Sequence, residues 1–245
     1  MRARTLAVTT LFAALVAAGA CSSDSPLPTL GFAGGTAGID TTNKARIRLV
    51  NATPTILDLA TSGVVAAGNA AIEFGEVSSC TPTNALQPDL TVRIGGTLVP
   101  IPGLAIAYQS GVSYTVIAYP GSLGSTQFAT IADLFAPIVG EAALRAFNAS
   151  APGTSYDVYV TIPGASLDST PPAFGNVRAG EVSGFANAGA GSPRQVRITF
   201  AGSKNVLVDI ANTALIEGQI VTLVIVAPLA GSTRPRVFTA EACGS

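Results

Sequence analysis

The sequence contains no histidine and no tryptophan, and charged residues make up only 11% of its 245 positions. Without histidine, the chain can form no Ser-His-Asp or Cys-His catalytic group and no histidine-ligated metal site. Its 13 basic and 14 acidic residues give a net charge of −1, which excludes the electrostatic footprint of a nucleic-acid-binding protein. We therefore expect no nucleic-acid partner, and no glycine-rich phosphate loop or calcium loop indicates a cofactor.

Hydrophobic residues are abundant, at 48% of the chain, which excludes intrinsic disorder. The first twenty residues have the parts of a secretory signal: Arg2 and Arg4, an apolar run over 6–18, and small residues before Cys21. The apolar run is shorter than the ~20 residues that a spanning helix needs. An uncleaved membrane anchor is the alternative interpretation.

The segment 18–21, Ala-Gly-Ala-Cys, resembles the lipobox of bacterial lipoproteins, in which the cysteine sulfur is acylated before cleavage. The resemblance implies a signal peptide over 1–20 and lipidation of Cys21, and Ser22 implies the outer membrane where the organism has one. Residues 21–43 are rich in Gly, Thr, Ala and Pro, which is typical of a flexible tether. The expected membrane partner is thus reached through an N-terminal lipid anchor.

With Cys21 assigned to lipid, two of the three cysteines remain. An exported chain folds in an oxidising compartment, so we predict a disulfide between Cys80 and Cys243. Two unpaired thiols are the alternative. Neither cysteine belongs to a CxxC pair, which argues against a zinc or redox site.

From residue 44 onward, short runs of alternating polar and apolar side chains predict β-strands, separated by Gly and Pro. The clearest predicted strands are 46–50, 91–94, 113–119, 156–160, 195–200, 206–210 and 220–226. Only 127–144 has helical character, and within it 129–135 is compatible with either a helical turn or a further strand.

The second half of this region repeats the first. The corresponding segments are 48–53 with 145–150, 58–59 with 157–158, 74–77 with 174–177, 91–94 with 195–198, and Gly111 with Gly218. The offset grows from 97 to 107 residues, which is typical of a duplicated domain with insertions in its loops. We predict an all-β chain of two tandem immunoglobulin-like antiparallel β-sandwich domains, residues 44–140 and 141–245.

The repeated motifs resemble the bacterial domain-of-unknown-function family 4397, over about residues 45–240. That family opens with a hydrophobic strand, His-Ala-Ser-Pro and Asp-Val-Tyr, and continues with Phe-Gly-x-Val and a Tyr-Thr-Val strand. Asn51 and Asn148 stand where the family has histidine, and Asp58 and Asp157 follow at the expected places. The resemblance implies an exported β-sandwich, often lipid-anchored, with no established activity.

Residues at matching places in the two halves are also candidates for catalysis or modification. Asp58 and Asp157 could form a catalytic carboxylate pair, but equivalent positions favour the same turn or strand-end bond in each repeat. Asn51 and Asn148 fit the N-glycosylation pattern, and their place between strand and turn favours turn geometry instead. Five tyrosines could line a carbohydrate platform or cover the edges of the core: Tyr108, Tyr114, Tyr119, Tyr156 and Tyr159.

We expect an exported, lipid-anchored protein of the cell envelope that is not an enzyme but a binding or structural module. An envelope protein or a glycan is the expected partner. The alternatives are a hydrolase that uses carboxylates alone, with Asp58, Asp157 or Asp209, and a self-assembling surface protein. An active site would recruit acids found in one half only. The sequence around those acids (Asp89, Asp133, Asp168 and Glu217) indicates no pocket.

Overall fold

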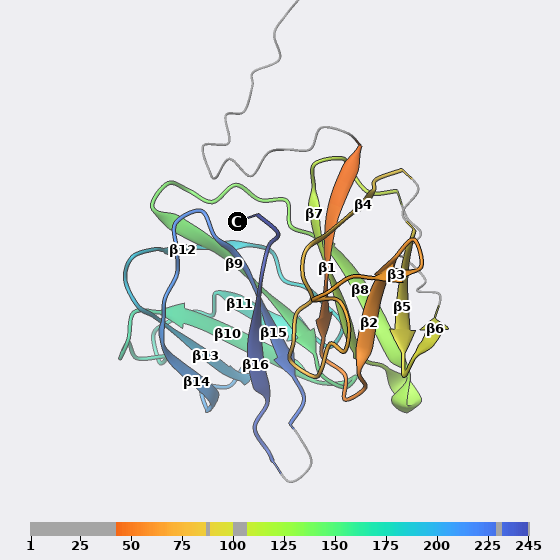
Figure 1. Ribbon diagram of the computed structural model, residues 1–245. Helices are drawn as coiled ribbons and strands as arrows, with labels where there is room; N and C mark the ends of the chain where they lie inside the picture. The colour runs from red at the N-terminus through yellow and green to blue at the C-terminus, as the bar shows by residue number, and fades with distance from the viewer. Residues whose placement is uncertain (1–42, 87–88, 100–106, 229–231, 245) are drawn as a thin grey trace, which may run out of the picture. The chain divides into compact units, whose positions relative to one another are not determined.

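The chain folds almost entirely into strands (Figure 1). The computed structural model describes residues 43–86, 89–99, 107–228 and 232–244, all within one compact unit, Gly34–Ser245. None of these residues forms a helix long and apolar enough to cross a membrane. The predicted signal peptide, Cys21 and the tether before residue 43 lie outside the described residues.

Eight strands, which we call repeat 1, come from the first half: β1 (Lys44–Asn51), β2 (Leu57–Thr61), β3 (Val64–Val65), β4 (Thr81–Asn84), β5 (Leu90–Ile94), β6 (Thr97–Val99), β7 (Ser113–Pro120) and β8 (Thr126–Ala132). Eight more, repeat 2, follow: β9 (Glu141–Ala149), β10 (Ser155–Thr161), β11 (Phe174–Arg178), β12 (Ala186–Gly189), β13 (Arg194–Phe200), β14 (Val206–Thr213), β15 (Ile220–Val226) and β16 (Arg236–Glu241). The described part holds one short 3-10 turn, η1 (Ser122–Gly124), in the β7–β8 hairpin.

The two repeats share one strand order. Repeat 1 has an inner sheet β4-β1-β7-β8 and an outer sheet β3-β2-β5-β6. Repeat 2 has an inner sheet β12-β9-β15-β16 and an outer sheet β11-β10-β13-β14, the same order shifted by eight strands. In both inner sheets the first and seventh strands pair in parallel, β1 with β7 and β9 with β15. The duplication read from the sequence is therefore present in the topology.

Each repeat has its own core between its inner and outer sheet. In repeat 1, Ile47 and Leu49 of β1 pack against Leu59 of β2 and Val92 of β5. In repeat 2, Leu144 of β9 and the corresponding side chains of β10 and β13 form the equivalent cluster. Side chains that alternate along β1 and β9 point to the other face of the inner sheet, because successive residues of a strand face opposite sides.

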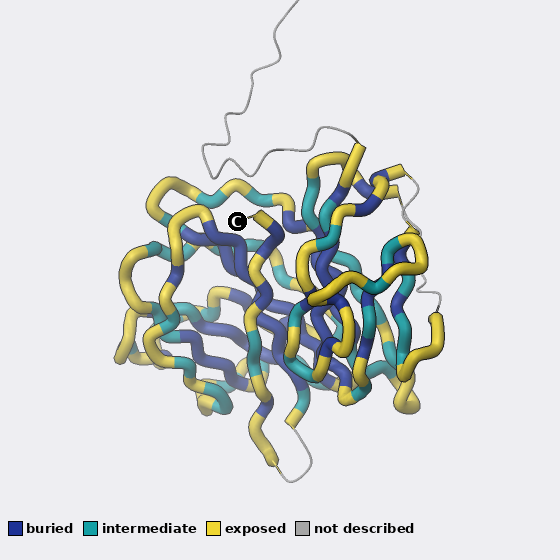
Figure 2. The backbone as a smooth tube through the Cα atoms, in the orientation of Figure 1, coloured by how far each residue is buried: buried dark blue, intermediate teal, exposed yellow. Residues whose placement is uncertain are grey.

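That other face forms a third core, which joins the repeats. Buried residues of both inner sheets make up one cluster: Val50, Ala52, Ile117, Phe147, Ala149, Val224, Val226 and Ala240. We call this layer the seam. Figure 2 shows buried backbone running through the inner strands of both repeats. A strand buried on both faces has a nearly continuous apolar sequence, and all seven residues of β15 are buried, with Thr222 as its one polar residue.

The seam is built from equivalent residues of the two repeats. The parallel pairings match Arg46 with Ser113 and Ala143 with Ile220, which makes Val50 equivalent to Phe147 and Ile117 to Val224. The same patch of each repeat therefore contacts its counterpart, as in the isologous interface of a two-fold dimer. The repeats pack like two subunits of a homodimer that share one chain.

The predicted all-β fold with two tandem sandwiches is confirmed, and the segment 129–135 begins with the last four residues of strand β8 and forms no helical turn. The strand order adds a finding that the sequence does not reveal. An immunoglobulin constant domain has four strands facing three, whereas each sandwich here has four facing four. The division placed at Gly140 falls between β8 and β9.

Two of the segment correspondences predicted from the sequence are wrong. Glu76 and Glu181 occupy equivalent places, because their carbonyl groups accept from the backbone of Asn51 and Asn148 respectively. Residues 74–77 therefore correspond to 179–182 and not to 174–177. Likewise Asp58 pairs with Arg93, and Asp157 pairs with Thr199. Residues 91–94 thus correspond to 197–200 and not to 195–198.

Candidate functional site

Asn51 and Asn148 hold the chain where β1 and β9 end. Both side chains are fully buried. The Asn51 amide donates to the carbonyl oxygens of Thr55 (2.7 Å) and Ile72 (2.8 Å), and its oxygen accepts from the Thr53 amide (2.9 Å) and hydroxyl (2.8 Å). All polar atoms of the side chain are thus engaged within the fold.

Asn148 repeats this arrangement bond for bond. Its amide donates to Thr154 and Val177, and its oxygen accepts from the amide and the hydroxyl of Ser150. A fully buried amide with these partners is inaccessible to a glycosyltransferase in the folded protein. Turn geometry, the interpretation that the sequence favours, accounts for both residues.

Asp58 and Asp157 also have the same local role. The Asp58 carboxylate accepts from the Ala71 amide at 2.7 Å, and Asp157 accepts from Asn176 at 2.7 Å and from Gly202 at 2.8 Å. Ala71 and Asn176 both have positive φ, so each carboxylate stabilises a left-handed backbone turn. The two carboxylates lie on the outer sheets of different repeats, and the structure does not bring them together. Asp209 accepts from the Gln195 amide on the outer surface of repeat 2.

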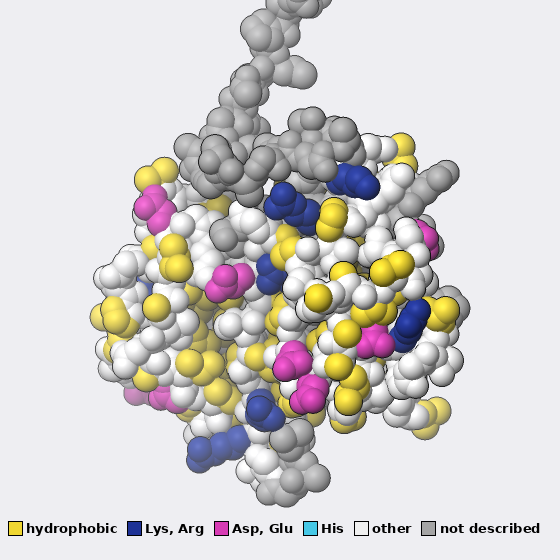
Figure 3. Space-filling view, in the orientation of Figure 1, with side chains coloured by type: hydrophobic (Ala, Val, Ile, Leu, Met, Phe, Trp, Pro, Cys, Tyr) yellow, Lys and Arg dark blue, Asp and Glu magenta, His cyan; other side chains and the backbone are white. Residues whose placement is uncertain are grey.

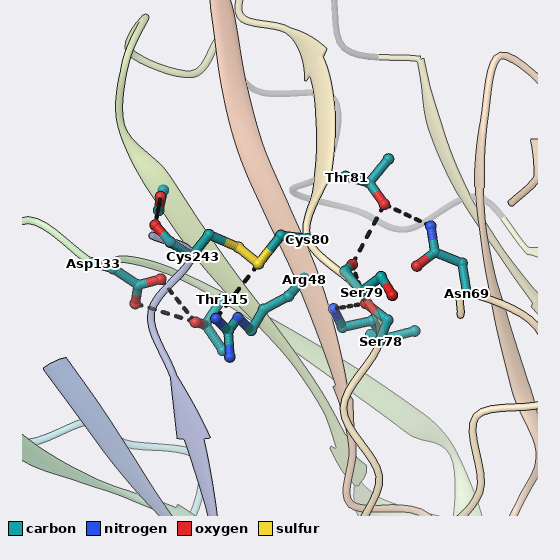
Figure 4. The surroundings of a disulfide bond; sticks show 11 residues. Arg48, Asn69, Ser78, Ser79, Cys80, Thr81, Thr115, Asp133 and Cys243 are labelled. Atoms are coloured by element: carbon teal, nitrogen blue, oxygen red, sulfur yellow. Dashed lines mark hydrogen bonds between the residues drawn. A yellow bond between two sulfur atoms is a disulfide. The ribbon is translucent and has the colours of Figure 1, made fainter. Parts of the chain in front are cut away.

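The predicted Cys80–Cys243 disulfide is confirmed, with the Cα atoms 5.8 Å apart (Figure 4). It connects the segment before β4 to the segment after β16, so it ties the C-terminal end of repeat 2 to repeat 1. The Ser113 hydroxyl, at the start of β7, donates to the Cys243 carbonyl at 2.9 Å. At the equivalent place in repeat 2, Phe185 stacks on Phe135 with ring centroids 4.6 Å apart. Each repeat thus contacts the segment that follows the last strand of the other repeat, once through a disulfide and once through an aromatic pair.

A charged cluster lies in the seam near the disulfide. Arg145 forms a buried ion pair with Asp133 and donates to Thr222 (2.9 Å) and to the Ala132 carbonyl (2.7 Å). Thr115 donates to both oxygens of Asp133. The sequence around Asp133 does not reveal this arrangement, because the partners come from strands far away in the chain.

Arg48 is the equivalent of Arg145, yet its contacts are much weaker. Its Nη2 lies 3.5 Å from the Cys80 sulfur, and its Nε is buried without a hydrogen-bond partner. The equivalent of Asp133 is Ala242, since the amides of both bind the carbonyl at the start of the adjacent strand, Ser113 or Ile220. Repeat 2 therefore offers no carboxylate at the place that Asp133 occupies in repeat 1.

Burial shifts the pKa values of this cluster. Loss of water lowers the pKa of Arg145 and of Arg48, and the charge of Asp133 opposes both shifts. Burial raises the pKa of the Asp133 carboxyl, while Arg145, Thr115 and Arg48 act to lower it. The cluster is a structural connection between the repeats, because Arg145 of β9 binds Asp133 and the carbonyl of Ala132, which lie at and just after the end of β8.

Other charged groups are spread out. Figure 3 shows acidic and basic side chains scattered over the visible face without a strongly charged patch. Among the described residues, no three acidic or cysteine side chains lie close enough to hold a metal ion. Of the two alternatives for the five tyrosines, burial favours packing at the core over a carbohydrate platform for four of them: Tyr108, Tyr114, Tyr156 and Tyr159.

The fifth tyrosine, Tyr119, lines a hollow of about 330 Å³ between the repeats. The β7–β8 hairpin forms one wall, and residues from the turns after β9 and β11 form the other. The hollow is lined by ten residues, none of them charged: Tyr119, Pro120, Gly121, Ser122, Ser125, Gln127, Ser150, Pro152, Ala179 and Gly180. It is the candidate binding site at the seam.

No protein-family model matches the chain, and no curated protein matches it. The resemblance to family 4397 therefore stays a prediction.

Proposed function

We propose that the protein is an exported, lipid-anchored module of the bacterial cell envelope that acts by binding or by holding a structure in place, and not by catalysis. The observation that supports this most is the pairing of Cys80 with Cys243. Structural disulfides form in exported proteins, and the pair leaves Cys21 as the one remaining cysteine of the three in the sequence. Cys21 is the residue that the lipobox resemblance assigns to lipid.

The repeat-equivalent polar residues also support a noncatalytic role. Asn51, Asn148 and Asp157 use their polar atoms to fix backbone turns. Asp133 is buried in an ion pair at the seam. These groups serve the fold, so a hydrolase built on them would first have to break the bonds that fix the turns within each repeat or the ion pair between the repeats.

The lipid anchor is tested by expressing the full chain in a bacterium with two membranes and labelling it with an alkyne palmitate. We expect label on the wild-type chain, loss of label in Cys21→Ala, and retention of label in Ser22→Ala as the matched control. Density-gradient separation should place the labelled protein with the outer membrane. An unlabelled wild-type chain with a free Cys21 would overturn the proposal.

A further inference from the structure

The hollow beside Tyr119 lies where three side chains differ between the two repeats. Tyr119 pairs with Gln127, and its equivalent Val226 pairs with Arg236. Gly180 and Gly75 are equivalent as well, since their amides bind the carbonyls of Asn148 and Asn51. The residues before these glycines are Ala179 in repeat 2 and Phe74 in repeat 1.

In the equivalent place, large side chains occupy the space. The Phe74 ring packs edge-on against Phe238 with centroids 5.9 Å apart, and the Arg236 guanidinium lies over it at 5.2 Å. The counterparts of these three residues are Ala179, Ala129 and Gln127, and two of them, Ala179 and Gln127, line the hollow. Two phenylalanines are thus replaced by alanines, and an arginine by a neutral amide.

The hollow presents neutral hydrogen-bonding groups. The Tyr119 hydroxyl has no hydrogen-bond partner in the part of the chain that the structure describes, although it lies close to Gly180, where a Cβ atom would approach it to 3.2 Å. Gln127 donates to Ser125 at 3.3 Å and keeps its amide oxygen for another partner. The ring of Tyr119 is fixed by an edge contact with Phe147, at 5.3 Å between centroids.

We propose that this hollow binds a single neutral sugar unit of an envelope glycan. A sugar ring offers many hydroxyl groups and no charge, which suits an uncharged site with hydroxyl, amide and aromatic groups. The absence of a charged side chain among the lining residues disfavours phosphate, carboxylate and cationic ligands. This inference rests on the proposed envelope function and specifies its partner.

The test uses the chain from residue 21 onward with Cys21→Ala, which retains every residue that the structure describes and carries no lipid. Glucose, galactose, mannose and N-acetylglucosamine are titrated separately while backbone amide signals are followed by NMR. At least one sugar should shift the signals of Gly121 and Gly180 in a saturable way. If none of the four sugars does so, or if the shifts lie elsewhere, the proposal is overturned.

Two variants locate the site. Ala179→Phe copies the residue of repeat 1 and should weaken binding at least roughly tenfold, the effect of losing ~1.4 kcal/mol. Tyr119→Phe removes one oxygen atom, keeps the ring packing and should weaken binding by a smaller factor, so it serves even if Ala179→Phe does not fold. Ile216→Phe, an exposed position before β15, is the matched control and should bind as the parent does.

The outcomes separate this inference from the proposed function. Sugar binding by a chain that is never acylated in cells would support the proposed sugar site and contradict the proposed lipid anchor. An acylated chain that binds none of the sugars, or whose Ala179→Phe variant binds unchanged, would keep the module and overturn the site.

Discussion

The two repeats agree where each sandwich is built and differ where they meet. Asn51 and Asn148 make the same four hydrogen bonds, and both inner sheets have the same strand order. At the seam, by contrast, the equivalent of Asp133 in repeat 2 is Ala242, and the equivalent of Cys80 is Phe185. The duplicated repeats thus share the hydrogen bonds and strand order within each sandwich. Their equivalent residues differ at the seam, where the two repeats contact each other.

The largest expected difference between equivalent residues concerns the two seam arginines. Arg145→Leu leaves Asp133 buried without its ion-pair partner and should cost about 3–5 kcal/mol of unfolding free energy. Arg48→Leu removes a buried guanidinium with an unpaired Nε and should leave stability unchanged or raise it. Urea unfolding followed by circular dichroism at pH 7 measures both.

The pH dependence of the Arg145→Leu variant gives a second check. Arg145 lowers the pKa of Asp133 against the effect of burial, so its removal raises that pKa further. A carboxyl with a folded-state pKa above its unfolded value stabilises the fold as pH falls. The variant should therefore recover stability on acidification, and an equal loss at every pH would contradict the ion-pair explanation.

The second prediction compares the two asparagines. Asn51→Ala and Asn148→Ala each leave buried backbone groups without partners and should cost about 2–3 kcal/mol. Because the bonds are equivalent, the two losses should agree within about 0.5 kcal/mol. Thermal and urea unfolding of both variants provides the measurement, with exposed Asn205→Ala as the control. A large loss of unfolding free energy at one position alone would show that the two sets of hydrogen bonds are not energetically equivalent.

The smallest expected effect concerns a tyrosine pair found only in repeat 1. Tyr108 and Tyr114 pack with centroids 4.6 Å apart, whereas repeat 2 has Leu215 and Val221 at the equivalent positions. Burial, with a contribution from Tyr114, raises the pKa of Tyr108 to about 12.

A phenol whose pKa is raised by folding stabilises the fold below its unfolded pKa, ~10, and that stability is lost as pH rises toward 12. The free energy of unfolding should fall by ~1 kcal/mol or more over this range. Tyr108→Phe should show a flatter profile between pH 10 and 12 in urea unfolding. A profile identical to that of the wild type would assign the alkaline loss to other groups.

Much of the fold is predictable from the sequence, because alternation and turn residues act locally. The strands around Arg48, Tyr114 and Tyr156 follow from side-chain period alone, and the cysteine count leads to the disulfide. The correspondence of 74–77 with 174–177 failed because a Phe-Gly pair recurs at 174–175. The backbone bonds select instead Gly-Glu-Val-Ser, which begins at Gly75 in one repeat and at Gly180 in the other.

The seam is the part that the sequence does not reveal. Asp133, Arg145 and Thr115 meet only because two inner sheets pack face to face, and nothing in the chain near Asp133 marks it as buried. The hollow at Tyr119 likewise depends on Ala179, a small residue whose importance appears only when Phe74 is recognised as its equivalent. Long-range packing decides both features.

The position of β1 determines how the folded unit responds to a mechanical load. β1 begins at Lys44, lies between β4 and β7, and pairs with β7 in parallel over six residues. A pull on the chain before Lys44 acts along this strand, so the hydrogen bonds on both of its sides must break together and not one after another. The N-terminal strand therefore resists unfolding in shear.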